Sequence, residues 1–294
     1  MNYSLGALKD KKDDRDYLIK DYISKVELPA KLDLSVKMLP VRNQENEGTC
    51  VSFATCAIKE SEEQNEGYLS TRNLYEKIKQ PQGGAYPRDS MKVLTDYGVP
   101  PESCQLYVPN SVTPVCPNAD ELAKPNKIQG YARLNTLEEM KQCLVQNGAF
   151  MIAVAVTNNW FSTTDGYIMG GGDIVGYHAI AFVGYDDELQ RIKFKNSWGE
   201  GWGDKGYGYI GYNNLLDILT DAWSFIDVPE HQEEGNPPKP PEPEPMPVPP
   251  EPMPVPPEPH PKPIPPTPEP NFIEKYWLVI VAAIITFIFG WIIL

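Results

Sequence analysis

The stretch VRNQENEGTCVSFATCAIKESEEQ, residues 41–64, decides which fold the sequence predicts. After Cys50, apolar residues recur at positions 51, 54, 57 and 58, a spacing that places them on one face of an α-helix. The turn-like Glu47-Gly48-Thr49 precedes this pattern, so the helix is expected to begin at Cys50. The positive end of the helix dipole favours a thiolate there, although such a cysteine is also typical of an ordinary buried position. Cys50 is therefore a candidate reactive thiol.

The residues around this helix divide the folded part into two halves. Residues 73–79 and 90–97 also predict helices. From Ala149 onward the pattern changes to short runs of β-branched and aromatic residues separated by Gly and Asp, namely AFMIAVAV, HAIAFVGY, RIKFKN and GYGYIGY. A helical half followed by a strand-rich half predicts an α+β protein with a cleft between two lobes.

The histidines limit the choice of a base for Cys50. The chain has three, and His231 and His260 lie at or beyond the edge of the folded part. A Cys/His pair would therefore consist of Cys50 and His178, although a lone histidine at the start of a strand is also typical of a structural residue. Asn196, at the end of the RIKFKN run, is the candidate acceptor for the far ring nitrogen.

A proline-rich segment follows the folded part. Of the 31 prolines, 20 fall between Pro237 and Pro270, and the motif MPVPPEP occurs twice. Proline at nearly every second position favours polyproline II, so residues 230–271 predict a stalk of up to roughly 100 Å. The stalk is interpreted as a spacer, with a docking site for a proline-reading module as the alternative.

The last residues predict a membrane anchor. Residues 276–294 carry no charge and would span roughly 29 Å as a helix, close to the thickness of a bilayer's hydrocarbon core. We expect a single transmembrane helix within residues 272–294, acting as a tail anchor. Lys262 and Lys275 precede the span and no charge follows it, which favours a cytosolic position for the folded domain.

Charge and cysteine content exclude or favour further classes. A net charge of −14 argues against nucleic-acid binding, which needs a basic surface. The N-terminus is charged and lacks an apolar run, so no signal peptide is expected. Without export disulfides are not expected, although Cys104 and Cys116 could close a small loop. Five cysteines leave at least one thiol unpaired.

Three sequence blocks resemble the signature blocks of the papain family of cysteine peptidases: VRNQENEGTCVSFA, GYHAIAFVGYDD and KNSWGEGWGDKGYGYI. The resemblance implies a two-lobed α+β fold, with a helical left lobe, a β-barrel-like right lobe and a cleft between them. It assigns residues 29–229 to the peptidase domain and leaves residues 1–28 as an N-terminal extension. A peptide or protein substrate is implied, with no cofactor and no metal.

The resemblance also implies a role for individual residues. Cys50 would attack a peptide carbonyl as a thiolate, with His178 as its imidazolium partner and an acyl-enzyme as the intermediate. Gln44 would donate to the oxyanion, and Asn196 would orient the imidazole. The substrate-binding residues implied are Gly83, Gly84, Ala179, Trp198 and Trp202, of which Trp198 would also shield the His178–Asn196 hydrogen bond.

The sequence departs from the family pattern at three places. Glu47 stands where extracellular members have a disulfide cysteine, and Val51 replaces a frequent tryptophan. Only 43 residues precede Gln44, so the long inhibitory propeptide of many members is not expected. Residues 1–28 could lie across the cleft instead, but we favour KDKKDDRDYL, residues 9–18, folding back on the surface.

Two other functions use the same residues. Acyl transfer to an amine, as in transglutaminases, needs the same Cys/His pair, but its sequence blocks differ from the Asn-Ser-Trp-Gly found here. A catalytically inactive domain that binds peptides and is displayed on a membrane stalk predicts the loss of a catalytic group. Gln44, Cys50, His178 and Asn196 are all present, which favours the peptidase.

Overall fold

The computed structural model describes residues 3–226. The predicted stalk (230–271) and membrane helix (272–294) lie outside these residues, as do residues 227–229 of the predicted peptidase domain. Within the described part, no helix has the length and apolar character needed to cross a bilayer.

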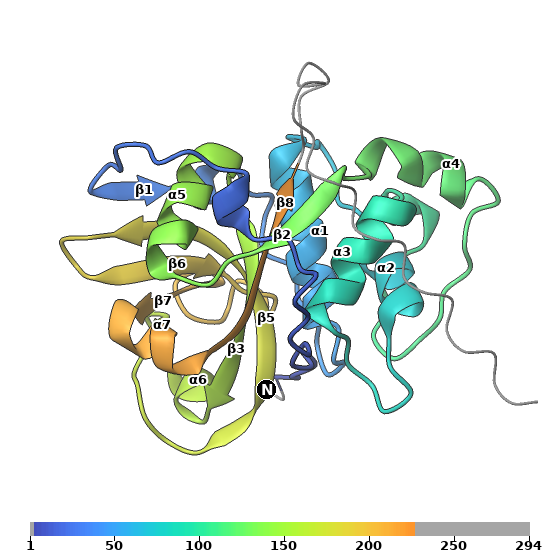
Figure 1. The fold of residues 1–294 in the computed structure, drawn as a ribbon. Helices are drawn as coiled ribbons and strands as arrows, with labels where there is room; N and C mark the ends of the chain where they lie inside the picture. Colours follow the sequence, from blue (N-terminus) through green and yellow to red (C-terminus); the bar gives the residue numbers. More distant parts are fainter. Residues whose placement is uncertain (1–2, 227–294) are drawn as a thin grey trace, which may run out of the picture. The chain divides into compact units, whose positions relative to one another are not determined.

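Three helices form one half of the molecule: α1 (Cys50–Glu62), α2 (Thr71–Ile78) and α3 (Pro87–Asp96) (Figure 1). All three were predicted, and α1 begins at Cys50 as the apolar pattern indicates. The Ser70 side chain accepts a hydrogen bond from the backbone of Asn73 and so caps α2, whereas α3 begins with a proline, which needs no hydrogen-bond partner there. Leu74, Met91 and Leu94 are buried between the helices.

An eight-stranded sheet forms the other half, in the order β2-β8-β3-β5-β6-β7-β4, with β1 pairing with β5 off this path. All ladders are antiparallel except the short β4–β7 pair. The strands are β1 (Lys31–Asp33), β2 (Gly130–Arg133), β3 (Phe150–Thr157), β4 (Tyr167–Ile168), β5 (Ile174–Asp186), β6 (Arg191–Lys195), β7 (Tyr207–Gly211) and β8 (Leu219–Ile226).

Residues along β3 alternate between two hydrophobic cores. Met151 and Ala153 belong to the core shared with α1, whereas Phe150, Ile152 and Val154 belong to the core on the other face of the sheet. The helical half therefore packs directly on one face of the sheet. The predicted α+β fold with two halves is confirmed, and the N-terminus of α1 lies at the seam between them.

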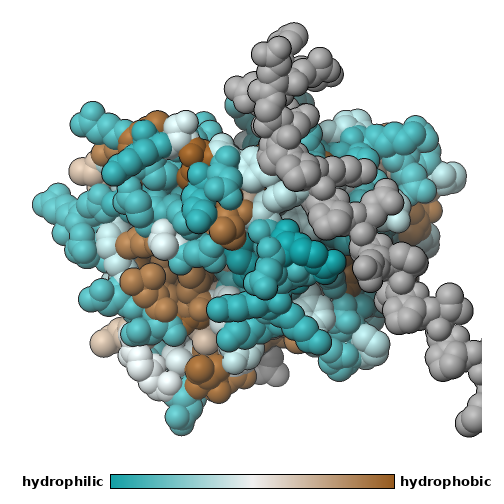
Figure 2. Space-filling view, viewed as in Figure 1, coloured by the Kyte–Doolittle hydropathy of each residue, from teal (hydrophilic) through white to brown (hydrophobic). Residues whose placement is uncertain are grey.

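Shorter elements complete the fold: α4 (Ala119–Ala123), α5 (Leu137–Asn147), α6 (Asn159–Ser162), α7 (Tyr212–Ile218), and the 3-10 turns η1 (Ile19–Asp21), η2 (Ser35–Lys37), η3 (Glu102–Cys104) and η4 (Lys124–Asn126). A capping box formed by Thr136 and Glu139 starts α5. Polar residues cover most of the visible face, and apolar residues gather near α7, where Leu216 is exposed (Figure 2).

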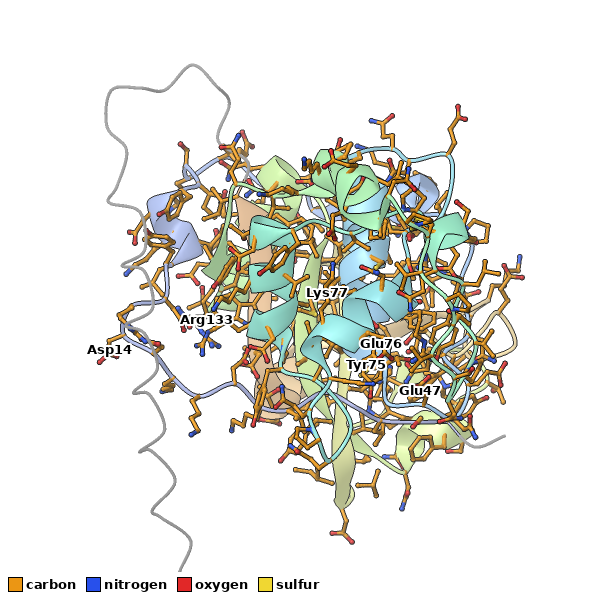
Figure 3. All side chains as sticks on the ribbon, turned by 90° about the vertical axis from the view of Figure 1, so that its right-hand side faces the viewer. Asp14, Glu47, Tyr75, Glu76, Lys77 and Arg133 are labelled. Carbon is orange, nitrogen blue, oxygen red and sulfur yellow. A yellow bond between two sulfur atoms is a disulfide. The ribbon has the colours of Figure 1, made fainter. Side chains whose placement is uncertain are left out.

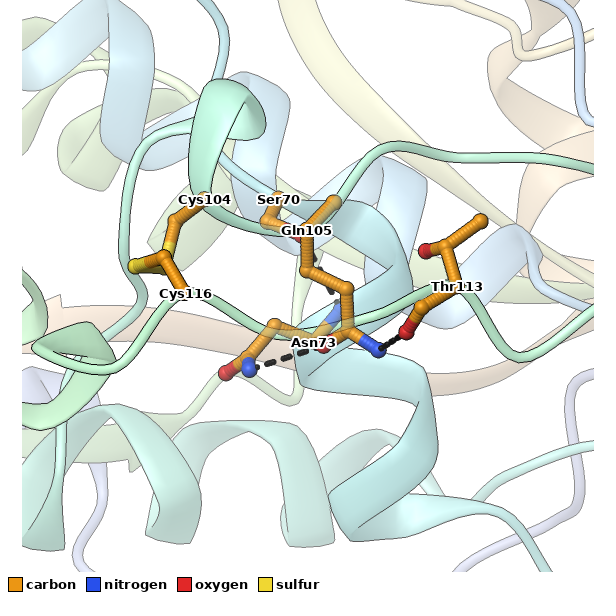
Figure 4. The surroundings of a disulfide bond; sticks show 6 residues. All are labelled: Ser70, Asn73, Cys104, Gln105, Thr113 and Cys116. Carbon is orange, nitrogen blue, oxygen red and sulfur yellow. Dashed lines mark hydrogen bonds between the residues drawn. A yellow bond between two sulfur atoms is a disulfide. The ribbon is translucent and has the colours of Figure 1, made fainter.

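A disulfide joins Cys104 to Cys116 (Figure 4), contrary to the expectation that the chain forms none. The two Cα atoms lie 4.9 Å apart, within the usual range for a disulfide. Gln105 lies in the loop that the disulfide encloses. Its side-chain oxygen accepts a hydrogen bond from Asn73 of α2 at 2.9 Å, and its side-chain amide donates to the Thr113 carbonyl of the same loop at 3.0 Å. Cys50, Cys56 and Cys143 are free and buried.

Candidate active site

Cys50 occupies the first turn of α1 and is completely buried. The backbone N–H groups of Ala179 on β5 and of Gly6 lower the pKa of its thiol, against the effect of burial. The helix start and the strand therefore converge on one thiol. His178 directly precedes Ala179 in β5.

His178 is held by the residue that the sequence singled out. Its Nε2 lies 2.8 Å from Oδ1 of Asn196, just after β6, and that oxygen also accepts from the Ser197 backbone at 2.8 Å. The Trp198 ring lies against the imidazole with a centroid distance of 4.6 Å. His178 Nδ1 is buried and has no hydrogen-bond partner among the described residues, so the imidazole and the Cys50 thiol are not hydrogen-bonded to each other in this structure.

Burial controls the protonation of this pair. Loss of solvent raises the pKa of the Cys50 thiol to about 11, against the lowering effect of the surrounding backbone N–H groups. It lowers the pKa of His178 to about 4, although the Asn196 hydrogen bond acts in the opposite direction. In this buried state the thiol and the imidazole are both neutral near pH 7. The thiolate–imidazolium pair expected from the sequence therefore needs access to solvent.

Gln44 is also completely buried and has a fixed orientation. Its backbone N–H donates to the Ser197 carbonyl at 2.8 Å, and its side-chain oxygen accepts from Ser197 Oγ at 2.6 Å. Its Nε2 donates to the carbonyls of Glu47 at 2.8 Å and Ser4 at 3.1 Å. This nitrogen thus already binds a peptide carbonyl, as an oxyanion donor must.

The Ser4 carbonyl belongs to the N-terminal segment, residues 3–10, which lies over the candidate catalytic residues. The Tyr3 ring stacks on Trp198 at a centroid distance of 4.7 Å, and Trp198 Nε1 donates to the Ser4 carbonyl at 3.3 Å. Further along, Asp10 reaches the other end of the cleft near α3 and β8. Residues 4–8 therefore cross the site, whereas Asp16, within the stretch expected on the surface, binds Arg88 and Arg133.

The five predicted substrate-binding residues are placed differently from one another. Gly83 and Gly84 have positive φ angles of 84° and 74°, and Gly84 lies against the carbonyl of Gly6. Ala179 contacts the Cys50 sulfur through its backbone, and Trp198 contacts the N-terminal segment. Trp202 lies behind Trp198, is 1% exposed and donates to the Trp160 carbonyl, so its position is that of a core residue.

A hydrogen-bond network around Glu47 was not predicted. Arg72 from α2 binds both carboxylate oxygens of Glu47, which also accept from the backbone of Asn110 at 2.9 Å and from the Tyr107 hydroxyl at 3.2 Å. The Gln44 carbonyl lies closer to the same hydroxyl, at 2.8 Å, so the single Tyr107 proton is shared between these two acceptors. The network joins the loop before Cys50 to α2 and to the disulfide loop. The position of Glu47, three residues before Cys50, was the available sequence signal.

An open hollow of about 580 Å³ continues from Gly83 along the helical half. Its walls include Glu47, Tyr75 and Glu76, which lie close together in Figure 3, and Val112 of the disulfide loop. Acidic and basic side chains both line it, since Arg72 and Lys79 contribute as well. This part of the cleft is accessible while Cys50 is buried.

Comparisons with known proteins agree with this geometry. Residues 28–224 match the model of the papain family cysteine proteases. The chain is 29% identical over 214 residues to a cysteine protease of the mite Blomia tropicalis, covering 64% of this chain and 63% of that protein. Over 221 residues it is 28% identical to peptidase 1 of Dermatophagoides pteronyssinus, covering 68% of this chain and 66% of the mite protein. The chain thus spans slightly less than two thirds of the length of these relatives.

Among solved structures, the fold is similar to that of xylellain, a cysteine protease from Xylella fastidiosa. The TM-score is 0.70 at 25% identity, covering 77% of this chain and 97% of xylellain. A procathepsin B from Trypanosoma congolense shares the fold with a TM-score of 0.65 at 20% identity, covering 77% of this chain and 87% of that one.

Proposed function

The chain belongs to the papain family of cysteine proteases, and from this premise we propose that it is a cysteine endopeptidase with Cys50 as nucleophile and His178 as base. The observation that supports this most directly is that the N-terminal segment lies at the site as an extended peptide. Its backbone is bound by Gln44 on one side of Cys50 and by Ala85 on the other. The site therefore presents to an extended peptide the hydrogen-bond donors that a cysteine peptidase needs.

The proposed reaction begins when the site opens to substrate. His178 takes the Cys50 proton, and the sulfur forms a bond to the carbonyl carbon of the scissile peptide. The carbonyl oxygen becomes an oxyanion held by Gln44 Nε2 and the Cys50 backbone N–H. When the C–N bond breaks, His178 gives its proton to the leaving amine. Water, deprotonated by His178, then cleaves the thioester and restores the thiol.

Asn196 and Trp198 act through His178 rather than on the substrate carbonyl. The 2.8 Å contact of Asn196 Oδ1 with Nε2 fixes the ring so that Nδ1 serves the thiol. The indole, at 4.6 Å, covers the imidazole and limits the access of water to that hydrogen bond. Both residues therefore keep the base in one orientation during proton transfer.

The test compares the full-length chain in detergent with its Cys50→Ala and Cys143→Ala variants on a fluorogenic peptide library under reducing conditions. Cys143 is the matched control because it is another free, buried cysteine outside the site. We expect hydrolysis in the wild type and in Cys143→Ala and none in Cys50→Ala. Loss of peptide hydrolysis in every sample, with peptide binding retained, would instead support the inactive peptide-binding alternative. An amide formed with an added amine would indicate acyl transfer.

We also propose that residues 272–294 anchor the enzyme in a membrane and that residues 230–271 form the spacer, which could also bind a proline-reading module. The charge-free run of residues 276–294 supports the anchor. Lys262 and Lys275 support a cytosolic position for the peptidase domain, whereas the Cys104–Cys116 disulfide is more typical of oxidising compartments.

Protease protection of sealed vesicles tests both proposals on the membrane. A cytosolic domain is digested without detergent, and a protected domain would place the enzyme on the opposite side. Deletion of residues 272–294 should release the protein into the soluble fraction. Continued sedimentation of the truncated protein with membranes would contradict the anchor.

A further inference from the structure

We propose that Tyr107 is a positioning residue for both oxyanion donors and that the Cys104–Cys116 disulfide holds it in place, so that reduction of the disulfide lowers turnover. This inference rests on the proposed peptidase function, because it concerns the support and regulation of the same site. The two donors are Gln44 Nε2 and the backbone N–H of Cys50. The turn between these two residues sets the distance between the donors.

Tyr107 contacts both ends of that turn. Its hydroxyl oxygen lies 2.8 Å from the Gln44 carbonyl oxygen and 3.0 Å from Oγ1 of Thr49, which directly precedes Cys50. Its ring packs edge-on against Phe53 of α1 with a centroid distance of 4.8 Å. Burial raises the pKa of Tyr107 above its ordinary value, so the hydroxyl keeps its proton at neutral pH. One side chain thus links the residue that carries the first donor to the turn that presents the second.

The turn between the donors needs such support. Glu45 and Asn46 are exposed, and the backbone φ of Glu45 is 56°, in the left-handed region that residues other than glycine rarely adopt. Strained backbone of this kind persists where surrounding contacts fix it. The disulfide loop supplies two of these contacts, one through Tyr107 and one through Asn110, whose side-chain amide donates to Asn46 Oδ1 at 2.7 Å.

The loop that carries Tyr107, residues 105–115, buries little aliphatic surface of its own. Its leucine and its three valines are all exposed, namely Leu106, Val108, Val112 and Val115. Polar contacts fasten it instead, such as the hydrogen bond from Asn73 to Gln105 (Figure 4). A surface segment with few buried apolar contacts opens easily. The disulfide that closes this loop therefore contributes much of its order.

A dithiol reductant would remove this constraint. Cys116 is partly exposed, whereas Cys104 is 5% exposed, so Cys116 is the more accessible of the two. One thiolate of the reagent attacks the Cys116 sulfur, the S–S bond breaks, and Cys104 leaves as a thiolate that takes up a proton. The second thiol of the reagent then displaces Cys116, which also becomes a thiol, and the reagent ends as a cyclic disulfide. The loop then keeps only its hydrogen bonds.

The experiment measures the affinities of a peptide aldehyde and of the matching peptide alcohol for the full-length wild type, Tyr107→Phe and Tyr185→Phe. The Cys50 sulfur adds to the aldehyde carbon, and the aldehyde oxygen then lies where the oxyanion forms, whereas the alcohol forms no such bond. Tyr185→Phe is the matched control, because it also removes a hydroxyl that donates to a backbone carbonyl, that of Pro29 at 2.7 Å.

We expect Tyr107→Phe to bind the aldehyde about tenfold more weakly, with unchanged binding of the alcohol, and to lower kcat about tenfold at nearly constant KM. Tyr185→Phe should match the wild type in every measurement. Unchanged aldehyde affinity in Tyr107→Phe overturns the positioning role and leaves the peptidase in place. A wild type that binds the aldehyde no more tightly than the alcohol has no oxyanion site, which rejects the proposed function and this inference together.

The role of the disulfide is tested with a dithiol and with Cys104→Ser/Cys116→Ser. We expect the double variant to bind the aldehyde as weakly as Tyr107→Phe, and the dithiol to weaken aldehyde binding in the wild type but not in the double variant. The dissociation constant does not depend on the fraction of Cys50 that is reduced, so the reagent's effect on that thiol does not interfere. If thermal unfolding shows the double variant to be misfolded, the wild type decides: unchanged aldehyde affinity after mass spectrometry shows the disulfide to be reduced overturns the redox control.

Discussion

At the scale of single residues, solvent access decides whether Cys50 and His178 form a reactive pair. Their pKa values, about 11 and about 4 in the buried state, leave both groups uncharged near neutral pH. Loss of solvent disfavours the charged form of either group. The sequence predicts the pair, but it does not show that the first residues of the chain remove its solvent.

We predict that Gln44→Ala lowers kcat about a hundredfold with little change in KM. The reason is the loss of one oxyanion donor, which acts mainly in the transition state. Initial rates over a range of substrate concentrations give both constants. A rise in KM at constant kcat would assign Gln44 to substrate binding instead.

The hydrogen bond between Asn196 and His178 leads to a second prediction. Asn196→Ala should lower kcat by about tenfold to a hundredfold, because a buried ring that loses its acceptor no longer holds one orientation. Asn196→Asp keeps an acceptor oxygen and should retain more activity than the alanine variant. Equal activity of the two variants would mean that the 2.8 Å contact does not orient the base.

Asp10 gives a pH dependence to the closed state, in which residues 4–8 lie across the site and Cys50 is buried. Burial, together with the nearby Asp221, raises the pKa of Asp10 to about 6, against the lowering effects of Trp223 and Arg88. The pKa of Asp221, which faces Arg133 as well, is also raised, chiefly by burial. Because both pKa values are higher in the closed state, protonation favours closure. Closure is strongest below about pH 4 and weakens as the pH rises toward 6.

We therefore expect the rate at which an epoxide peptide probe labels Cys50 in the wild type, divided by the rate in Asp10→Asn, to rise about tenfold between pH 4 and 7. Asp10→Asn carries no titratable group at position 10, so division by its rate removes the titration of Cys50 itself. A wild-type ratio that is constant, or that falls with pH, would contradict this role of Asp10.

At the scale of elements, Glu47 joins three segments around the nucleophile. Its carboxylate binds Arg72 of α2 and the backbone of the disulfide loop, while its carbonyl holds the Gln44 amide. Arg72 is only 1% exposed and also bridges Glu76 at 3.2 Å, so removing Glu47 would leave this buried charge with one acidic partner instead of two. The network therefore fixes the loop that carries the oxyanion donor.

We predict that Glu47→Gln lowers the free energy of unfolding by about 2 kcal/mol, because Arg72 keeps Glu76 as a partner, and that it reduces kcat more than it raises KM. The double variant Glu47→Gln/Arg72→Gln should lose less stability than the sum of the two single variants, because each single variant already removes the interaction between the two side chains. Denaturant unfolding and steady-state kinetics measure both effects. Additive losses would show that the two side chains act independently.

Local patterns predicted the elements that carry the catalytic residues. The apolar spacing after Cys50 gave α1, and the β-branched runs gave β3, β5, β6 and β7. β8 was not predicted, since LTDAWSFI combines buried apolar residues with Asp221 and shows no alternation. Asp221 is tolerated there because Arg133 neutralises it at 2.8 Å. Such long-range compensation leaves no trace in a local pattern.

At the scale of the whole molecule, contacts distant in sequence close the site. Ser4 meets Gln44 and Trp198, and Asp10 meets Trp223, across separations of up to 213 residues. The short run Ser4-Leu5-Gly6-Ala7 has neither helical nor strand periodicity, so its place over Cys50 could not be predicted. The disulfide between Cys104 and Cys116 likewise depends on the tertiary fold that brings the two cysteines together.

Mass spectrometry of the wild type after treatment with an epoxide peptide probe shows whether Cys50 is the nucleophile of a peptidase, with peptide hydrolysis followed in the same sample. We predict one adduct per chain, located on Cys50, and loss of hydrolysis in proportion to labelling. Hydrolysis that persists in fully labelled protein, or an adduct on Cys56 or Cys143 with Cys50 unmodified, would show that Cys50 is not the nucleophile.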